Sequence, residues 1–116
     1  GTHDNDTTLG WWKAAPDTER EFAASYLALD RSDPVKGFLE ALWESRAMVA
    51  IAPLQDLLRL DSSARMNIPG TTDANWRWRA THDQITDEWI PAQLSDLNRR
   101  YRRAPGSQTS RRNSHP

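Results

Sequence analysis

The sequence has 116 residues, of which 37% are hydrophobic and 27% charged, and its mean hydropathy is negative. One small domain fits this length, but such a domain has only a narrow margin of stability. The low apolar content therefore predicts that the chain needs further protein to pack against. Its net charge of −1 indicates no polyanionic partner, and the absence of cysteine excludes disulfides and thiolate metal sites.

Basic side chains are concentrated at the carboxyl end. Residues 97–116 contain six arginines and no acid, whereas the preceding residues hold the other nine basic side chains and all sixteen acidic ones. Such a tail could contact nucleic acid or an acidic protein through its charge. Because residues 104–116 are rich in Pro, Gly, Ser and Asn, we expect a disordered basic tail instead.

The amino-terminal end has neither the charged region nor the apolar region of a signal peptide. No apolar run approaches the roughly 20 residues that cross a bilayer. The sequence begins at Gly1 rather than at a methionine. We therefore expect it to be cut from a longer polypeptide.

Residues 1–10 are polar and typical of turns, so the first helix is predicted to begin near Thr18. Thr18 and Glu21 have the spacing of a capping box. Four apolar side chains then share one face of this helix, namely Phe22, Ala23, Tyr26 and Leu27.

A second helix is predicted to begin at Pro34, because proline suits the first helical position. Ser32 or Asp33 can cap it. Its apolar side chains follow a helical spacing throughout, at Val35, Phe38, Leu39, Leu42 and Trp43.

Residues 48–53 form a continuous apolar run that ends in proline. Continuous apolarity is typical of a strand buried on both faces of a parallel sheet. A short helix is predicted directly after it, over residues 54–58. This order of helix, buried strand and helix indicates an α/β barrel or a doubly wound sheet. Since one strand cannot form a sheet, its partner strands are expected elsewhere.

Residues 61–82 are predicted to be mostly loop. A last helix is expected from about Thr86 to Arg103, and Pro91 should begin or kink it. One side of this helix carries the apolar residues Ile90, Leu94, Leu97 and Tyr101.

Polar groups are densest in residues 2–8, which contain two carboxylates, an amide, an imidazole and three hydroxyls. Such groups suit the vicinal hydroxyls of a sugar. A solvated turn with local hydrogen bonds is the alternative. His3 and Asp4 also resemble the His-Asp pair of metal-dependent hydrolases, but only His82 and His115 could complete such a site, so no metal is expected.

Two further segments are candidates for a site. Gln55 and Asp56 follow the predicted strand, where barrels and doubly wound sheets place their sites, although they could equally cap a helix. The other candidate consists of residues 63–71 followed by residues 75–79, which alternate tryptophan and arginine after Asn75. Asparagine and arginine side chains can bond sugar hydroxyls. Indole faces complement a pyranose ring, but a half-buried extended segment with arginines stacked on Trp76 and Trp78 explains the pattern as well.

Beyond composition, residues 1–12 closely resemble the segment at the end of the seventh barrel strand in amylomaltases, the 4-α-glucanotransferases of glycoside hydrolase family 77. Three later segments resemble the next landmarks of that family in the same order, at residues 53–58, 64–70 and 75–79. The resemblance covers about residues 1–101. It implies a cytoplasmic enzyme that transfers α-1,4-glucan segments between maltodextrins with retention and needs no cofactor or metal.

The resemblance also implies roles for individual residues. Asp4 matches the carboxylate that stabilises the transition state, and His3 and Asn67 match sugar-binding residues. Asn5, Gln55, Asp56, Asn75, Trp76 and Trp78 are expected to support the site. A retaining mechanism needs a nucleophile and an acid/base about 5–5.5 Å apart, and in this family both lie on earlier strands.

We therefore predict an α/β fold in which residues 1–103 are the last strand-helix units of a (β/α)₈ barrel, mostly helical with one or two short strands. The expected partners are a maltooligosaccharide and the rest of the barrel, with no nucleic acid and no membrane. Two alternatives remain open, a helical interaction module with a basic tail and a His-Asp metal-dependent hydrolase.

Overall fold

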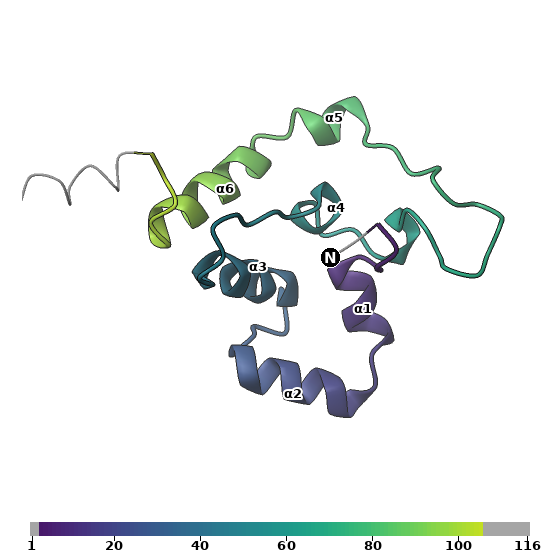
Figure 1. Ribbon diagram of the computed structural model, residues 1–116, viewed down its shortest axis with the longest axis horizontal. Coiled ribbons are helices and arrows are strands. Elements are labelled where there is room, and N and C mark those ends of the chain that lie inside the picture. The colour runs from purple at the N-terminus through teal and green to yellow at the C-terminus, as the bar shows by residue number, and fades with distance from the viewer. Residues whose placement is uncertain (1–2, 106–116) are drawn as a thin grey trace, which may run out of the picture.

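A computed structural model describes residues 3–105 (Figure 1). This part of the chain contains α-helices and one short 3₁₀ helix, and no strand occurs between residues 3 and 105. The elements in chain order are α1 (Thr8–Ala14), α2 (Asp17–Leu27), α3 (Pro34–Glu44), α4 (Leu54–Leu57), η1 (Ser62–Ala64), α5 (His82–Ile85) and α6 (Trp89–Arg100).

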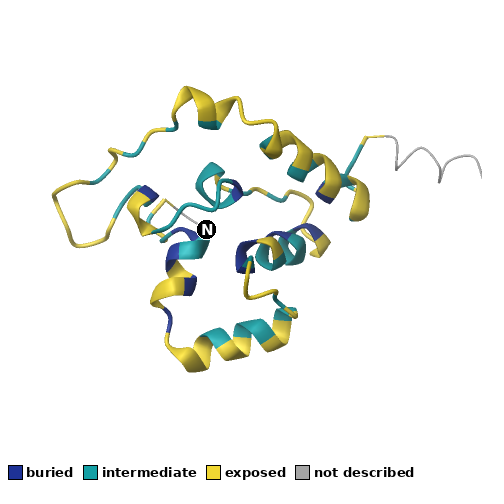
Figure 2. Ribbon diagram, turned by 180° about the vertical axis from the view of Figure 1, so that it is seen from behind, coloured by how far each residue is buried: buried dark blue, intermediate teal, exposed yellow. Residues whose placement is uncertain are grey.

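The helix α3 is the centre of the packing. It contacts α1, α2 and α6, while α1 also contacts η1. In Figure 1, α1 and α3 stand at the two ends of α2, α4 lies near the middle, and a long connection leads through α5 to α6. Figure 2 shows buried positions mainly on α1, α3 and α4, whereas α2 and the connection to α5 are largely exposed.

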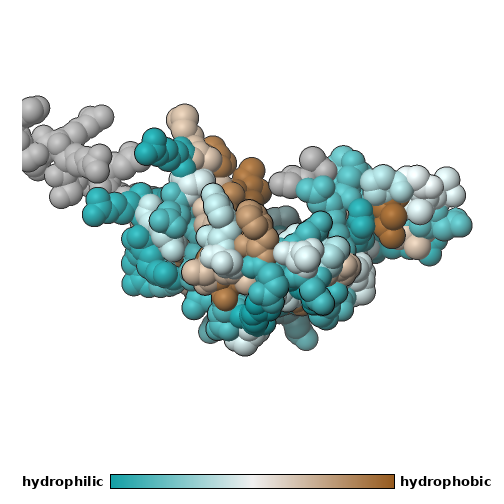
Figure 3. All heavy atoms as spheres, turned by 90° about the horizontal axis from the view of Figure 1, so that it is seen from below, coloured by the Kyte–Doolittle hydropathy of each residue, from teal (hydrophilic) through white to brown (hydrophobic). Residues whose placement is uncertain are grey.

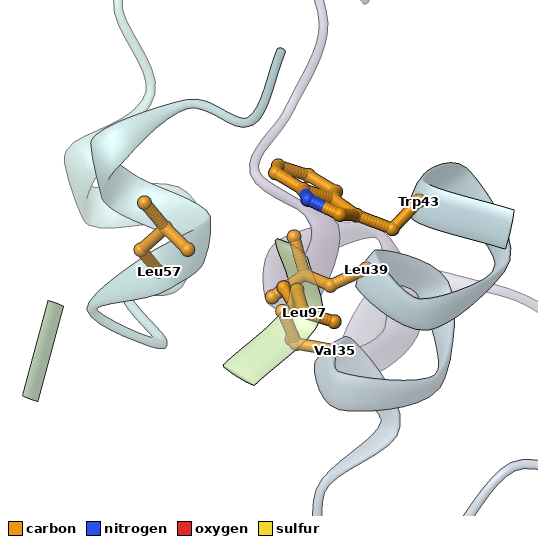
Figure 4. Close-up of a cluster of buried hydrophobic side chains, with 5 residues drawn as sticks. All are labelled: Val35, Leu39, Trp43, Leu57 and Leu97. Carbon is orange, nitrogen blue, oxygen red and sulfur yellow. The ribbon is translucent and has the colours of Figure 1, made fainter. Parts of the chain in front are cut away.

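The hydrophobic core lies where α3, α4 and α6 converge. Figure 4 shows Val35, Leu39 and Trp43 projecting from one face of α3, with Leu97 and Leu57 completing the cluster. The indole N–H of Trp43 donates a 2.9 Å hydrogen bond to the Asn98 side chain, so its polar atom is satisfied. Partly buried apolar residues surround this core, namely Leu9, Leu42, Ala50, Ala52, Ile90, Leu94 and Tyr101.

Four predicted helices are confirmed, among them α2, which begins at Asp17, close to the predicted Thr18. Pro34 is the first residue of α3, α4 covers most of residues 54–58, and the apolar side of α6 faces the core as expected. Pro91 lies in the first turn of α6, where its missing N–H costs nothing. Asp33 precedes α3 without capping it, because its carboxylate pairs with Arg59 at 2.8 Å.

Two predictions about the amino-terminal half are wrong. The capping box at Thr18 does not form, because α2 begins at Asp17 after Pro16 and has no side-chain cap. The polar start of the sequence contains a helix, α1, that begins at Thr8. The hydroxyl of Thr7 caps it by accepting a 3.0 Å bond from the Gly10 N–H.

The predicted strand at residues 48–53 is also wrong for this structure. The segment is irregular, and Met48 and Ile51 are 97% and 77% exposed. A strand of a parallel sheet needs neighbours for its backbone groups, and residues 3–105 supply none. Met48, Val49 and Ile51 therefore stay on the surface, while Ala50 and Ala52 pack against the core.

Other large apolar side chains are exposed as well. Phe22 and Tyr26 stack at 5.8 Å on the outer face of α2, a helix with no buried residue. Figure 3 shows hydrophobic surface in the middle of the molecule between hydrophilic flanks.

No helix within the described residues is long and apolar enough to cross a membrane. The predicted disordered tail falls almost entirely at residues 106–116, outside the described part.

Candidate functional site

The segment before α1 is held in place by two carboxylates. Asp6 accepts hydrogen bonds from the Thr7 N–H at 2.7 Å and from the Ser62 hydroxyl at 2.8 Å. Gly10 is needed here, because a Cβ at this position would clash with Ser62 and Asp6. Asp6 therefore ties the segment before α1 to η1.

Asp56 has a similar supporting role from α4. One oxygen of its carboxylate accepts the Thr8 N–H at 2.8 Å and the other accepts the Thr8 hydroxyl at 2.7 Å. Its neighbour Gln55 donates to the Ala64 carbonyl at 3.4 Å. These two residues, which the sequence analysis singled out as supporting, contact the start of α1 and the end of η1.

Asp4 differs from both carboxylates because side chains of the candidate site hold it. The Asn67 amide donates a 2.7 Å hydrogen bond to the Asp4 carboxylate, although the two residues are 63 positions apart. The imidazole Nε2 of His3 lies 3.3 Å from the same oxygen. The Asp4 side chain is 44% exposed. The structure thus brings together three residues predicted to bind sugar.

Arg65 connects the same two segments through the main chain. Its guanidinium donates to the Asp4 carbonyl at 2.6 Å and to the Asn67 carbonyl at 2.9 Å. Arg65 lies in the segment 64–70 that resembles the family, but its link to Asp4 was not predicted, because the partner carbonyl is 61 positions away.

Residues 66–76 form a closed loop. The Asn75 side chain accepts from the Ile68 N–H at 2.9 Å and donates to Thr71 at 3.0 Å and 3.1 Å. The Trp76 N–H closes the loop by donating to the Met66 carbonyl at 2.6 Å. Asn75 therefore shapes the loop that begins beside Asn67.

Trp76, at the far end of this loop, lies next to the candidate site. Its backbone is in the left-handed region, with φ of 61°, and its ring lies 4.9 Å from the His3 ring. Trp78 is half-buried, whereas Trp76 is mostly exposed. Trp76 is thus a neighbour of His3.

Two cavities adjoin these residues. A cavity of about 410 Å³ lies between the amino-terminal segment, α3 and the start of α4, and His3 and Asn5 are among its lining residues. A second cavity of about 650 Å³ includes Asp4, Asn5 and Arg65. Both cavities are lined by polar groups and by apolar side chains such as Phe38.

The donor set suits a neutral polyhydroxy ligand. A carboxylate accepts hydrogen bonds, an amide both donates and accepts them, and an exposed indole offers a flat apolar face. Among residues 3–105, no group of three or more His, Asp or Glu side chains is arranged to hold a metal ion.

Comparison with known proteins gives the family. Residues 1–85 match the family described as 4-alpha-glucanotransferase. The chain belongs to this family.

Individual relatives carry the same description. A 4-alpha-glucanotransferase of Streptococcus pneumoniae serotype 4 is 44% identical over 105 residues, covering 89% of this chain and 21% of the relative. A chloroplastic/amyloplastic enzyme of Oryza sativa is 41% identical over 106 residues, covering 89% and 18%. An enzyme of Thermus thermophilus is 43% identical over 95 residues, covering 76% and 19%. The chain therefore spans about a fifth of the length of these relatives.

A solved structure is similar over nearly the same region. Amylomaltase from Streptococcus agalactiae in complex with acarbose superposes with a TM-score of 0.82 and 29% identity, covering 90% of this chain and 21% of that one. The comparisons support neither of the two alternatives that the sequence analysis left open.

Proposed function

We propose that this chain is the last part of a 4-α-glucanotransferase that transfers α-1,4-glucan segments between maltodextrins with retention. Asp4 stabilises the transition state, and His3 and Asn67 bind the same sugar ring. The nucleophile and the acid/base reside in the remainder of the polypeptide. No cofactor takes part.

The observation that carries this proposal is that Asn67 and His3 both contact the Asp4 carboxylate, which lines a cavity. Asp6 and Asp56 are each bound by a backbone N–H and a hydroxyl of the scaffold, whereas Asp4 lies beside Asn67 and His3. A carboxylate held by polar side chains at a cavity can accept bonds from sugar hydroxyls. Such bonds to the 2-hydroxyl strengthen in the transition state of glycoside cleavage.

The fold of the longer protein is part of the proposal. Residues 48–53 become a buried strand of a (β/α)₈ barrel when the preceding strands are present. The exposed apolar side chains of this segment support the idea, since parallel strands in barrels are covered on both faces. In a barrel, the end of that strand would lie at the carboxyl-end face, where such enzymes have their sites.

A carbohydrate ligand is supported by the amylomaltase of Streptococcus agalactiae, which was solved in complex with acarbose. By this similarity we propose maltooligosaccharides as substrates. A cytoplasmic location stays a prediction for this chain, and the relatives of Oryza sativa, Solanum tuberosum and Arabidopsis thaliana are described as chloroplastic/amyloplastic.

The test is an assay of the longer polypeptide on maltotriose. We expect release of glucose together with longer maltooligosaccharides, because a transferase moves a glucan segment to a second sugar rather than to water. Hydrolysis alone, with maltose and glucose as the only products, would contradict the transferase assignment. Absence of any reaction would overturn the proposed function.

A further inference from the structure

We propose that Arg65 is a positioning residue that fixes the orientation of Asp4 relative to Asn67, and this inference rests on the function proposed above. Arg65 acts through Asp4 and makes no bond to the reacting sugar. Its contacts join two segments that the chain separates by about sixty positions.

The geometry of the guanidinium carries the argument. Arg65 uses Nη2 for the Asp4 carbonyl at 2.6 Å and Nε for the Asn67 carbonyl at 2.9 Å. These nitrogens share one edge of a rigid planar fork. The separation between the two carbonyls is therefore set by the fork. The same two residues meet again through their side chains, where the Asn67 amide donates to the Asp4 carboxylate at 2.7 Å.

Apolar packing cannot replace this contact. Ala64 is buried, but residues 68–74 beyond Asn67 are all exposed. A loop with few buried apolar contacts is ordered by its polar contacts, so loss of Arg65 frees the loop to shift. The segment that contains Asp4 would lose one of its connections to this loop.

A small displacement of this carboxylate has a large catalytic effect. A misplacement of about 1 Å by a distant substitution can reduce a rate about 100-fold. Because Asp4 is proposed to act in the transition state, the loss should fall on kcat and leave KM nearly unchanged.

The chain offers a matched control. Arg103 also uses Nε and Nη2 to bind main-chain carbonyls, those of Trp43, Ser45 and Ala47 at 2.8–2.9 Å, but it does so at the end of α3. Arg65→Gln and Arg103→Gln therefore remove the same kind of contact at two places, of which only one adjoins Asp4.

The experiment uses the longer polypeptide and maltotriose. We expect Arg65→Gln to lower kcat about 100-fold at nearly constant KM, and Arg103→Gln to lower the unfolding temperature with kcat close to that of the parent. Arg65→Lys should recover little of the rate, because an ammonium group lacks the planar fork. A normal kcat in both Arg65 variants would overturn the inference. If Arg65→Gln fails to fold, the kcat of Arg65→Lys provides the test instead.

A double-mutant cycle separates positioning from direct binding. If Arg65 acts through Asp4, adding Arg65→Gln to Asp4→Asn should leave kcat about where Asp4→Asn alone puts it. Two losses that multiply would show a separate role for Arg65 and contradict the proposal.

A crystal structure of Arg65→Gln distinguishes failure of this inference from failure of the proposed function. We expect the bond between the Asn67 amide and the Asp4 carboxylate to be broken in the variant. An unchanged Asp4–Asn67 bond would overturn the positioning role. This measurement needs no activity, so it decides the question even if the parent polypeptide transfers no glucan.

Discussion

The three aspartates near the site differ in their roles because their hydrogen-bond partners differ. Asp6 and Asp56 each accept hydrogen bonds from a hydroxyl and a backbone donor that belong to the scaffold. Asp4 instead meets an amide and an imidazole, although both Asp4 and Asp6 line the second cavity. The sequence puts Asp4 and Asp6 two positions apart, so only their contacts separate a structural carboxylate from a candidate functional one.

Substitution of Asp4 tests the proposed catalytic role directly. Asp4→Asn in the longer polypeptide keeps the size of the side chain and removes its charge. Transition-state bonds to the sugar supply several kcal/mol, and each ~1.4 kcal/mol is a factor of ten, so kcat should fall at least about 100-fold.

Steady-state kinetics on maltotriose measure this effect, with Asp73→Asn as the control because Asp73 is exposed in the loop 66–76. A near-normal rate for Asp4→Asn would remove Asp4 from the site.

Substitution of Asp56 should affect stability first. Asp56→Ala removes the acceptor for both the N–H and the hydroxyl of Thr8 at the start of α1. Loss of a capping side chain costs about 0.5–2 kcal/mol. Chemical denaturation of the longer polypeptide measures this loss, and Thr8→Val, which keeps the backbone bond, should cost less. Equal stability of Asp56→Ala and the parent would contradict the supporting role.

At the scale of the elements, α3 holds the others together. It contacts α1, α2 and α6, and its buried face consists of Val35, Leu39 and Trp43. The helical spacing of apolar residues predicted this face correctly. It could not predict which elements cover it, because α6 meets α3 across more than fifty positions, as the bond from Trp43 to Asn98 shows.

Truncation of this face should destabilise the chain strongly. Leu39 is buried between α3 and the neighbouring helices, so Leu39→Ala leaves a cavity and should cost about 2–5 kcal/mol. The exposed Lys36 on the same helix provides the control, and Lys36→Ala should change the free energy of unfolding little. Urea titration of the longer polypeptide measures both variants. If Leu39→Ala lowered the free energy of unfolding as little as the control does, Leu39 would not belong to a buried core in the longer polypeptide.

The 3₁₀ helix η1 makes a pH-dependent contribution to the stability of the fold. Asp61 caps it, and bonds from the side chain and backbone of Ser63, with Lys13 nearby, hold the pKa of Asp61 below its usual value. A lowered folded-state pKa gives stability that is present above the unfolded pKa of about 3.9 and is lost as the pH falls through the folded pKa.

We therefore expect Asp61→Asn to be less stable than the parent at neutral pH and the difference to shrink below about pH 4. Thermal unfolding of both proteins across this range measures it. A difference that stayed constant with pH would show that the carboxylate charge contributes nothing.

At the scale of the whole molecule, the exposed apolar run is the main departure from an ordinary surface. Met48, Val49 and Ile51 are largely exposed in a segment without strand partners. Contiguous exposed apolar side chains generally mark a surface that another protein segment covers. In the proposed barrel, that cover is the neighbouring strands and helices.

One substitution should have opposite effects in two contexts. Ile51→Lys should increase the solubility of the isolated 116-residue chain, because it removes an exposed apolar side chain. In the longer polypeptide it should prevent folding or lower stability severely, because a charge would be buried without a partner.

Ile51→Val keeps the apolar character and serves as the control in both contexts. Soluble yield and thermal unfolding are the measurements. If Ile51→Lys were harmless in the longer polypeptide, residues 48–53 would not be a buried strand.

Local sequence patterns predicted several helices and the candidate site residues. Apolar spacing fixed α3 and α6, proline marked the starts of both, and the resemblance of residues 1–12 pointed to His3 and Asp4 as candidate sugar ligands. These features depend on neighbours within one or two turns, so they can be read from a short window.

Which of these groups contact one another depends on the three-dimensional fold. In the folded chain, Asn67 bonds Asp4, whereas Asp6 and Asp56 bond scaffold groups. Arg65 connects two segments that are distant in the sequence. The fold also leaves residues 48–53 without the strand that their composition predicted. The physical reason is the same in each case: hydrogen-bond partners and sheet neighbours come from distant positions, and a local pattern does not specify which distant group will satisfy a polar atom or cover an apolar face.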